Sequence, residues 1–192
     1  MRILLVTIVV LCALGRPADA GDLVISGSLE GQDTAWDTDS AGYGKLMTDY
    51  RFGFWSLSFV SKLGYGTVDE RVLEYLDLGA RFWRRLGRTS LYIRPGLVHQ
   101  HEIPRESIEA GRFSTAIGVG DGIRHRAGVS AGGGVLVDLL PHKHGTFFAV
   151  AHVSTAYMFE NEKGPSAYWG AGLGIGFTYE LTIRVGNSGD TQ

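Results

Sequence analysis

Hydrophobic and polar residues alternate with a period of two through most of the chain. The pattern is clearest over residues 167–181, where Trp169, Leu173 and Phe177 share one parity and positions 170, 172, 174 and 176 are all glycine. Successive side chains of a β-strand point to opposite faces of the sheet, so this segment predicts a strand with one bulky and one bare face. The same period predicts eight strands, over residues 22–30, 43–52, 54–65, 71–84, 89–100, 123–139, 146–159 and 167–181.

The connections between the predicted strands alternate in length. Tight turns are expected near residue 52, over 85–89 and over 140–145, whereas the joins at 31–42, 66–70, 101–122 and 160–166 are mostly longer. Outer-membrane barrels have short periplasmic turns and longer external loops, and their strands need about 9–11 residues to span the bilayer. We therefore predict an all-β fold: an eight-stranded antiparallel up-and-down transmembrane β-barrel with both termini in the periplasm.

The direction of the two faces separates a membrane barrel from a soluble one. A soluble barrel has an apolar interior. The interior of an eight-stranded barrel is only just wide enough for ordinary side chains, so the many bulky residues on the apolar faces of this chain would not fit inside it. We expect the apolar faces to meet lipid and the lumen to be polar and filled, with its charges paired because unpaired buried charges are costly. The expected lumen ions are Arg51, Lys62, Arg81, Arg94, Arg124 and Arg126 with Glu30, Asp49, Asp77, Asp138 and Glu180.

The aromatic residues of the outward faces fall into two predicted belts, as in the girdles of lipid-facing walls. The glycines at 170–176 would leave lumen space for Phe148, His152 and an arginine, and Pro95 predicts a β-bulge because it cannot donate a ladder hydrogen bond. The belts comprise Phe52, Trp55, Phe82, Phe147, Phe177 and Tyr179 at the periplasmic end, and Tyr65, Tyr157, Phe159 and Trp169 at the external end.

The N-terminal residues have the pattern of a secretory signal peptide. Arg2 precedes an apolar run over 3–14, and Ala18-x-Ala20 has the small residues of a cleavage site. We predict a cleaved signal over 1–20, a barrel over 21–181 and a polar tail over 182–192. Removal of the signal takes the single cysteine, Cys12, and changes the formal net charge from −2 to about −3, which does not favour nucleic acid as a partner.

The C-terminal strand carries a resemblance to a known group. Gly174-x-x-Phe177-x-Tyr179 is similar to the strand signal by which outer-membrane barrels are recognised for assembly, although a polar tail follows it here. By pattern, the mature chain resembles the superfamily of small eight-stranded outer-membrane β-barrels that includes the OmpA transmembrane domain and OmpX. The resemblance implies a monomer in the bacterial outer membrane, inserted by the barrel assembly machinery and surrounded by outer-membrane lipid and lipopolysaccharide. It leaves the function open, because the group includes adhesins, anchors, small pores and lipid-modifying enzymes.

Three groups of residues could carry chemistry. His152-x-Ser154 resembles the His-x-Ser of lipid A deacylases, but its parity places both side chains in the lumen, which favours polar filling. His99, His101, Glu102 and His125 lie where two strands meet the longest loop, and cross-strand histidines could share a metal. Histidines commonly occupy barrel rims without one, so we expect no metal and no cofactor.

Arginines at the external mouth are the candidate binding residues. Arg124 and Arg126 are predicted to point into the barrel mouth, with Arg105 and Arg112 in the loop above. Arginine suits phosphates such as those of lipopolysaccharide, and internal ion pairing is the alternative. We expect a non-catalytic structural or surface-interaction protein acting through loops 31–42 and 101–122, with a lipid hydrolase using His152 and Ser154, or a narrow pore, as alternatives.

Overall fold

The computed structural model describes residues 21–34, 40–66, 71–106, 122–159 and 166–181. The predicted signal peptide (1–20), the predicted C-terminal tail (182–192), Arg112 and much of the long loops lie outside these residues. No helix within the described ranges is long and apolar enough to cross a membrane.

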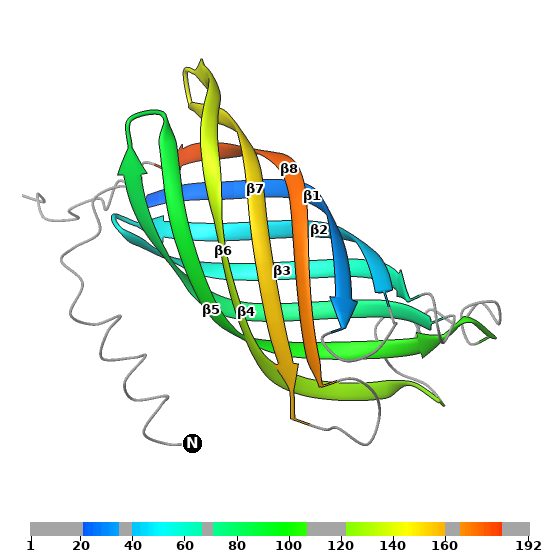
Figure 1. The fold of residues 1–192 in the computed structure, drawn as a ribbon. Coiled ribbons are helices and arrows are strands. Elements are labelled where there is room, and N and C mark those ends of the chain that lie inside the picture. Colours follow the sequence, from blue (N-terminus) through cyan, green and yellow to red (C-terminus); the bar gives the residue numbers. More distant parts are fainter. Residues whose placement is uncertain (1–20, 35–39, 67–70, 107–121, 160–165, 182–192) are drawn as a thin grey trace, which may run out of the picture.

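Eight antiparallel strands form a closed barrel, which confirms the predicted fold class (Figure 1). Each strand pairs with its neighbours in chain order, and β8 closes the barrel by pairing with β1. The strands are β1 (Gly21–Thr34), β2 (Ser40–Phe52), β3 (Trp55–Gly66), β4 (Arg71–Leu86), β5 (Thr89–Pro104), β6 (Arg124–His142), β7 (Gly145–Met158) and β8 (Ala167–Leu181).

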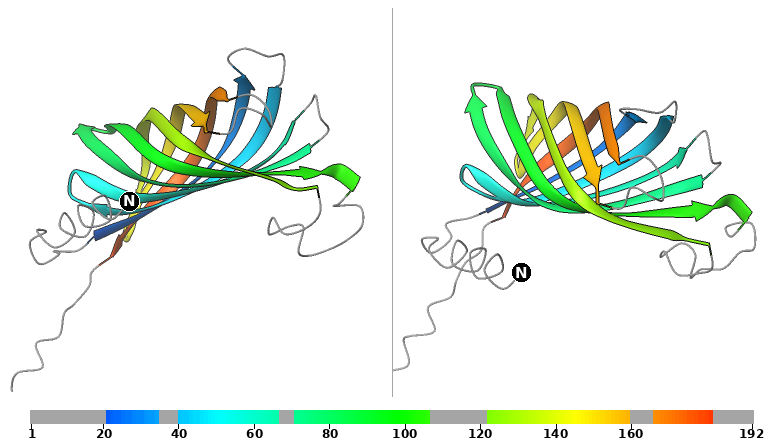
Figure 2. Two further views of the ribbon diagram at one scale, coloured as in Figure 1. Left: turned by 90° about the horizontal axis from the view of Figure 1, so that it is seen from below. Right: turned by 60° about the horizontal axis from the view of Figure 1, so that its bottom comes forward.

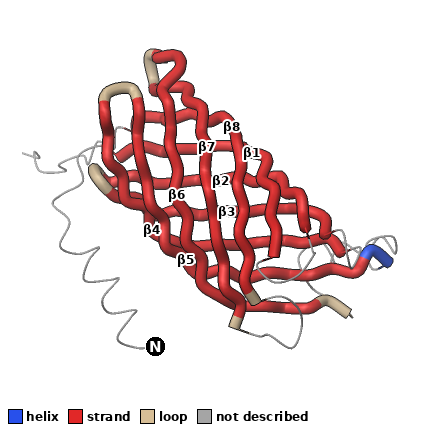
Figure 3. Tube along the Cα trace, in the orientation of Figure 1, coloured by secondary structure: helices blue, strands red, loops and turns tan. Residues whose placement is uncertain are grey.

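The barrel has a turn end and a loop end, as the lengths of the connections predicted. Tight turns join β2 to β3, β4 to β5 and β6 to β7, and they gather at the end where β1 begins and β8 finishes (Figures 1 and 2). Gly53 and Gly87 have φ values of 61° and 63° in two of these turns, a conformation that glycine adopts without a Cβ clash. Strands make up nearly all of the described wall (Figure 3). At the loop end, β1, β2, β3 and β5 extend further than predicted, with β5 ending at Pro104, whereas β6 and β7 are one residue shorter there.

The apolar faces of the strands point outward, as predicted for a membrane barrel. Leu173 and Leu29 are 71% and 77% exposed, whereas Asp49, Arg81 and Arg126 are fully buried inside. Exposed aromatic residues occupy both ends of the outer wall: Phe82, Phe147 and Tyr179 at the turn end, and Tyr65, Tyr157, Phe159 and Trp169 at the loop end. Phe52, Trp55 and Phe177 are partly exposed, and Phe52 stacks on Trp55.

The lumen is polar in its middle and holds a cluster of aromatic and aliphatic side chains toward each end. Near the turn end, Trp83, Tyr92 and Phe148 pack with Val24, Leu136 and Val150. Near the loop end, a second cluster combines tyrosines with aliphatic side chains: Tyr43, Leu73, Tyr75, Val98, Ala156, Met158 and Tyr168. The alternation in the sequence predicted the polar filling but not these clusters, because their members share strand faces with charged residues.

The predicted bulge at Pro95 is wrong. The β4–β5 pairing is interrupted between Gly79 and Phe82 and then resumes in the same register, and the β5–β6 register is continuous through Pro95. The proline therefore removes local pairing without inserting a residue. The register shift lies instead in the β6–β7 pairing, between Asp138 and Leu140.

Candidate functional site

Glu30 is the centre of a buried polar cluster in the lumen. Only 2% of the Glu30 residue is exposed. Its Oε2 atom lies 3.0 Å from Lys45 Nζ and 2.9 Å from His152 Nε2. Its Oε1 accepts a 2.8 Å hydrogen bond from Ser154 Oγ and a short hydrogen bond from Lys62. Because these partners come from β2, β3 and β7, the carboxylate links four strands through the barrel interior.

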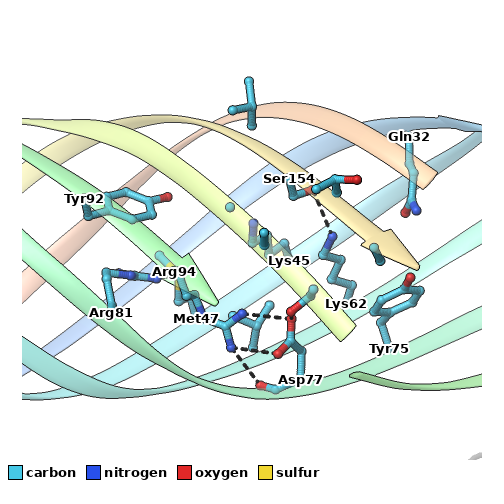
Figure 4. A pocket seen from close by; sticks show the side chains of 17 residues that line it. Gln32, Lys45, Met47, Lys62, Tyr75, Asp77, Arg81, Tyr92, Arg94 and Ser154 are labelled. Carbon is cyan, nitrogen blue, oxygen red and sulfur yellow. Dashed lines mark hydrogen bonds and ion pairs between the residues drawn. The ribbon is translucent and has the colours of Figure 1, made fainter. Parts of the chain in front are cut away.

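Two further acid–arginine pairs fill the lumen beside this cluster. Arg94 holds Asp77 with two hydrogen bonds of 2.8 and 2.9 Å (Figure 4). Arg81 donates to Asp49 over 2.5 Å, and both side chains are fully buried. Paired, hydrogen-bonded ions are the form in which charge is tolerated away from water.

The predicted lumen pairings hold for the central ions and fail near the turn end. Asp77, Asp49 and Glu30 have the expected cationic partners. Asp138 instead pairs with Arg85, whose side chain is 59% exposed, and Glu180 is exposed. Both acids have inward parity but lie so close to the strand ends that solvent reaches them.

Glycines in β8 make room for this packing, as the bare face predicted. A Cβ on Gly172 would lie 2.6 Å from the His152 ring, and one on Gly176 would lie 2.3 Å from the Phe148 ring. The three atoms nearest to a Cβ on Gly170 would belong to Glu30, Gly31 and Ser154.

A small cavity lies among the central side chains of the described lumen. A cavity of about 30 Å³ lies between residues that include Lys45, Lys62, Asp77 and Arg94 (Figure 4). This volume is on the scale of one or two water molecules. The middle of the lumen is therefore a packed, ion-paired interior.

His152 and Ser154 lie together, but their arrangement differs from that of a serine hydrolase. In such enzymes the histidine accepts the proton of the serine, and the acid orients the histidine. Here the Ser154 hydroxyl donates to Glu30, and Glu30 also contacts the imidazole. The carboxylate occupies the position between the two, and the three side chains face the lumen rather than the lipid.

The sequence did not reveal the importance of Glu30 and Lys45 in this cluster. Parity placed Glu30 in the lumen but did not identify it as the carboxylate beside His152 and Ser154. Lys45 shares the inward parity of Asp49 on β2, a signal that could have identified it. Glu30 on β1 meets His152 and Ser154 on β7 because their side chains extend across the interior of the closed barrel. Strand parity shows which side chains point inward but not which of them meet.

At the mouth of the barrel, Arg124 and Arg126 both pair with Glu102. The distances are 3.5 Å for Arg124 and 3.1 Å for Arg126, and Arg126 also donates a 2.6 Å hydrogen bond to the Tyr168 hydroxyl. The Arg124 side chain is 36% exposed, whereas that of Arg126 is buried. Arg105 is exposed in the short helical turn after β5. Their proposed role in binding phosphates stays a prediction.

The rim histidines occupy the opposite side of the wall from Glu102. His99, His101 and His125 have the outward parity of Leu97, whereas Glu102 contacts the lumen arginines. His101 pairs with His125 across the β5–β6 ladder, and His99 pairs with Ala127. Glu74 rather than Glu102 is the carboxylate beside these histidines.

Known structures with a similar fold include small outer-membrane barrels. Neisserial surface protein A (NspA) matches with a TM-score of 0.57 and 10% identity, covering 84% of this chain and 97% of NspA. The N-terminal β-barrel domain of Pseudomonas aeruginosa OprF matches with a TM-score of 0.53 and 20% identity, covering 83% and 99%. Ail, the attachment invasion locus protein of Yersinia pestis, matches with a TM-score of 0.50 and 13% identity, covering 84% and 99%.

No protein-family model and no curated protein sequence matches the chain. At these low identities, the structural matches speak for the fold rather than for a shared activity. Together with the closed ring of eight antiparallel strands, they confirm the resemblance noted from the sequence. The chain has the fold of the small eight-stranded outer-membrane β-barrels.

Proposed function

We propose that this protein resides in the bacterial outer membrane and has a non-catalytic structural or surface-interaction role. The observation that carries the proposal is the inverted distribution of side chains: an exposed apolar wall around an ion-paired lumen. Such a wall is stable in lipid and would aggregate in water. A monomer inserted by the barrel assembly machinery fits a barrel that closes on itself.

The surface role is assigned to the external loops 31–42 and 101–122, with lipopolysaccharide phosphates as the proposed ligand. Arg105 and the partly exposed Arg124 lie at the loop end, where the outer leaflet would surround the barrel. Guanidinium groups bind phosphate through paired hydrogen bonds. Two proteins with this fold are named as a surface protein and as an attachment invasion locus protein, which supports a surface role for the fold.

Binding of purified lipopolysaccharide by the refolded protein in micelles tests this proposal. The double variant Arg105→Gln/Arg124→Gln should bind more weakly, because it loses two cations at the loop end. The matched control is Arg84→Gln, which removes an exposed arginine near the turn end. Equal affinity for the wild type and the double variant would contradict the assigned binding residues.

The hydrolase alternative has a direct test in the release of fatty acid from lipopolysaccharide. We expect no activity in the wild type, because Ser154 is hydrogen-bonded to Glu30 inside the lumen. A measurable activity that Ser154→Ala abolishes, with the barrel still folded, would establish the enzyme and overturn the non-catalytic proposal.

A further inference from the structure

Three histidines converge on the outer face of the barrel near its loop end. His99 and His101 lie two residues apart on β5, and His125 pairs with His101 across the β5–β6 ladder. One ring nitrogen from each lies within 4.8 Å of the others, and His125 Nδ1 is 3.4 Å from His99 Nε2. The ring centroid of His101 lies 4.6 Å from that of His99 and 4.7 Å from that of His125.

The β-register aligns a carboxylate with this cluster. Glu74 on β4 pairs with His101, which in turn pairs with His125 on β6, so one row crosses three strands. Glu74 Oε2 lies 2.9 Å from His101 Nδ1. A carboxylate on one ring nitrogen fixes the orientation of the imidazole and directs the other nitrogen at a metal, an arrangement common around zinc-binding histidines.

The spacing of the nitrogens is close to that of a metal site. Zinc–nitrogen bonds of about 2.0–2.1 Å in a tetrahedral site place neighbouring ligand nitrogens about 3.3 Å apart. The His99–His125 distance of 3.4 Å already matches. His99 and His125 are exposed, so small side-chain rotations can bring the remaining nitrogens into range, while His101 is held by Glu74.

From this geometry we propose that His99, His101 and His125 bind a divalent transition-metal ion, with Zn²⁺ as the best match, and that Glu74 positions His101. Three neutral imidazoles suit zinc and leave a fourth coordination position for water or another oxygen ligand. The site would connect β5 to β6 directly and β4 through Glu74. It lies on the outward face, separate from the arginines that contact Glu102 in the lumen.

The sequence predicted no metal because histidines commonly occupy barrel rims without one. The candidate cluster also included Glu102, which the structure places on the lumen side. The observed pairing of His101 with both Glu74 and His125 turns four scattered residues into one cluster.

Isothermal titration of Zn²⁺ into the folded protein in micelles tests the proposal. We expect one ion per chain, with affinity at least tenfold lower in His101→Ala and in His125→Ala, and about 10–100-fold lower in Glu74→Gln. The matched control is His142→Ala/His144→Ala, which removes a histidine pair from the turn end, where the ring centroids are 5.9 Å apart. Unchanged affinity in the His101 and His125 variants, or its loss in the control, would overturn the proposal.

A second measurement uses the wild-type protein and so does not depend on folded variants. Zn²⁺ should protect His99 and His125 from diethyl pyrocarbonate, as read by mass spectrometry of each modified histidine. His142 and His144 serve as internal controls and should react equally with and without zinc. Equal modification of His99 and His125 under both conditions would contradict the site.

Discussion

At the residue scale, the lumen depends on a few acids that each satisfy several donors. Glu30 alone contacts Lys45, Lys62, His152 and Ser154, and it is almost fully buried. Removing one member of a buried ion cluster leaves its partners charged and without compensation, which costs far more than losing an exposed pair.

Glu30→Ala should therefore lower the free energy of unfolding by about 3–5 kcal/mol, since it leaves two buried lysines facing each other. The matched control is Asp138→Ala, whose partner Arg85 is largely exposed, and we expect a loss of about 0–1 kcal/mol there. Urea unfolding in lipid vesicles, followed by tryptophan fluorescence, measures both. Similar losses in the two variants would show that the lumen cluster is not a dominant source of stability.

A second residue-scale prediction concerns the bare face of β8. In Gly172→Ala the new methyl group would lie 2.6 Å from the His152 ring and 2.5 Å from the Leu29 carbonyl oxygen, so we expect a loss of about 1–3 kcal/mol. Gly27→Ala is the control, because no atom lies within 4 Å of its Cβ position on the outer face. In the same assay, Gly172→Ala should have a clearly lower free energy of unfolding than Gly27→Ala. The reverse order would contradict the packing.

At the element scale, the sequence predicted which face of each strand points outward but not how neighbouring strands align. Parity is a local property of one strand, so it correctly placed Leu173 outside and Asp49 inside. Register depends on the partner strand, and a shift of two residues preserves parity while changing every cross-strand neighbour. For this reason Glu74 was not recognised as the carboxylate beside the rim histidines. Glu102 follows His101 on the same strand, has the opposite parity and contacts the lumen arginines instead.

The outward assignment predicts a position-dependent cost for charge on the strands. Leu173 lies between Leu29 and Ala151 in an outward row. Leu173→Arg should therefore lower the free energy of unfolding in a bilayer by about 2–4 kcal/mol. Leu86→Arg, at the turn end of β4, should cost only about 0–1 kcal/mol because the side chain reaches the interface. Equal costs for the two variants in vesicles would argue against a lipid-facing wall.

At the scale of the whole molecule, the packed lumen predicts a barrel that does not conduct. Arg94 and Asp77, Arg81 and Asp49, and the Glu30 cluster leave a central cavity of only about 30 Å³. Purified protein in planar bilayers should therefore show no stable single-channel steps at neutral pH. Reproducible steps that scale with the amount of inserted protein would favour the narrow-pore alternative and contradict the packed interior.

The most direct test of the membrane assignment is cell fractionation followed by gel mobility with and without heating. If the apolar wall faces lipid, the protein should sediment with outer membranes and resist extraction by carbonate. The unheated band should also migrate differently from the heated one, because a closed barrel resists detergent until it is boiled. Recovery of the folded protein in the soluble fraction without detergent would contradict the account.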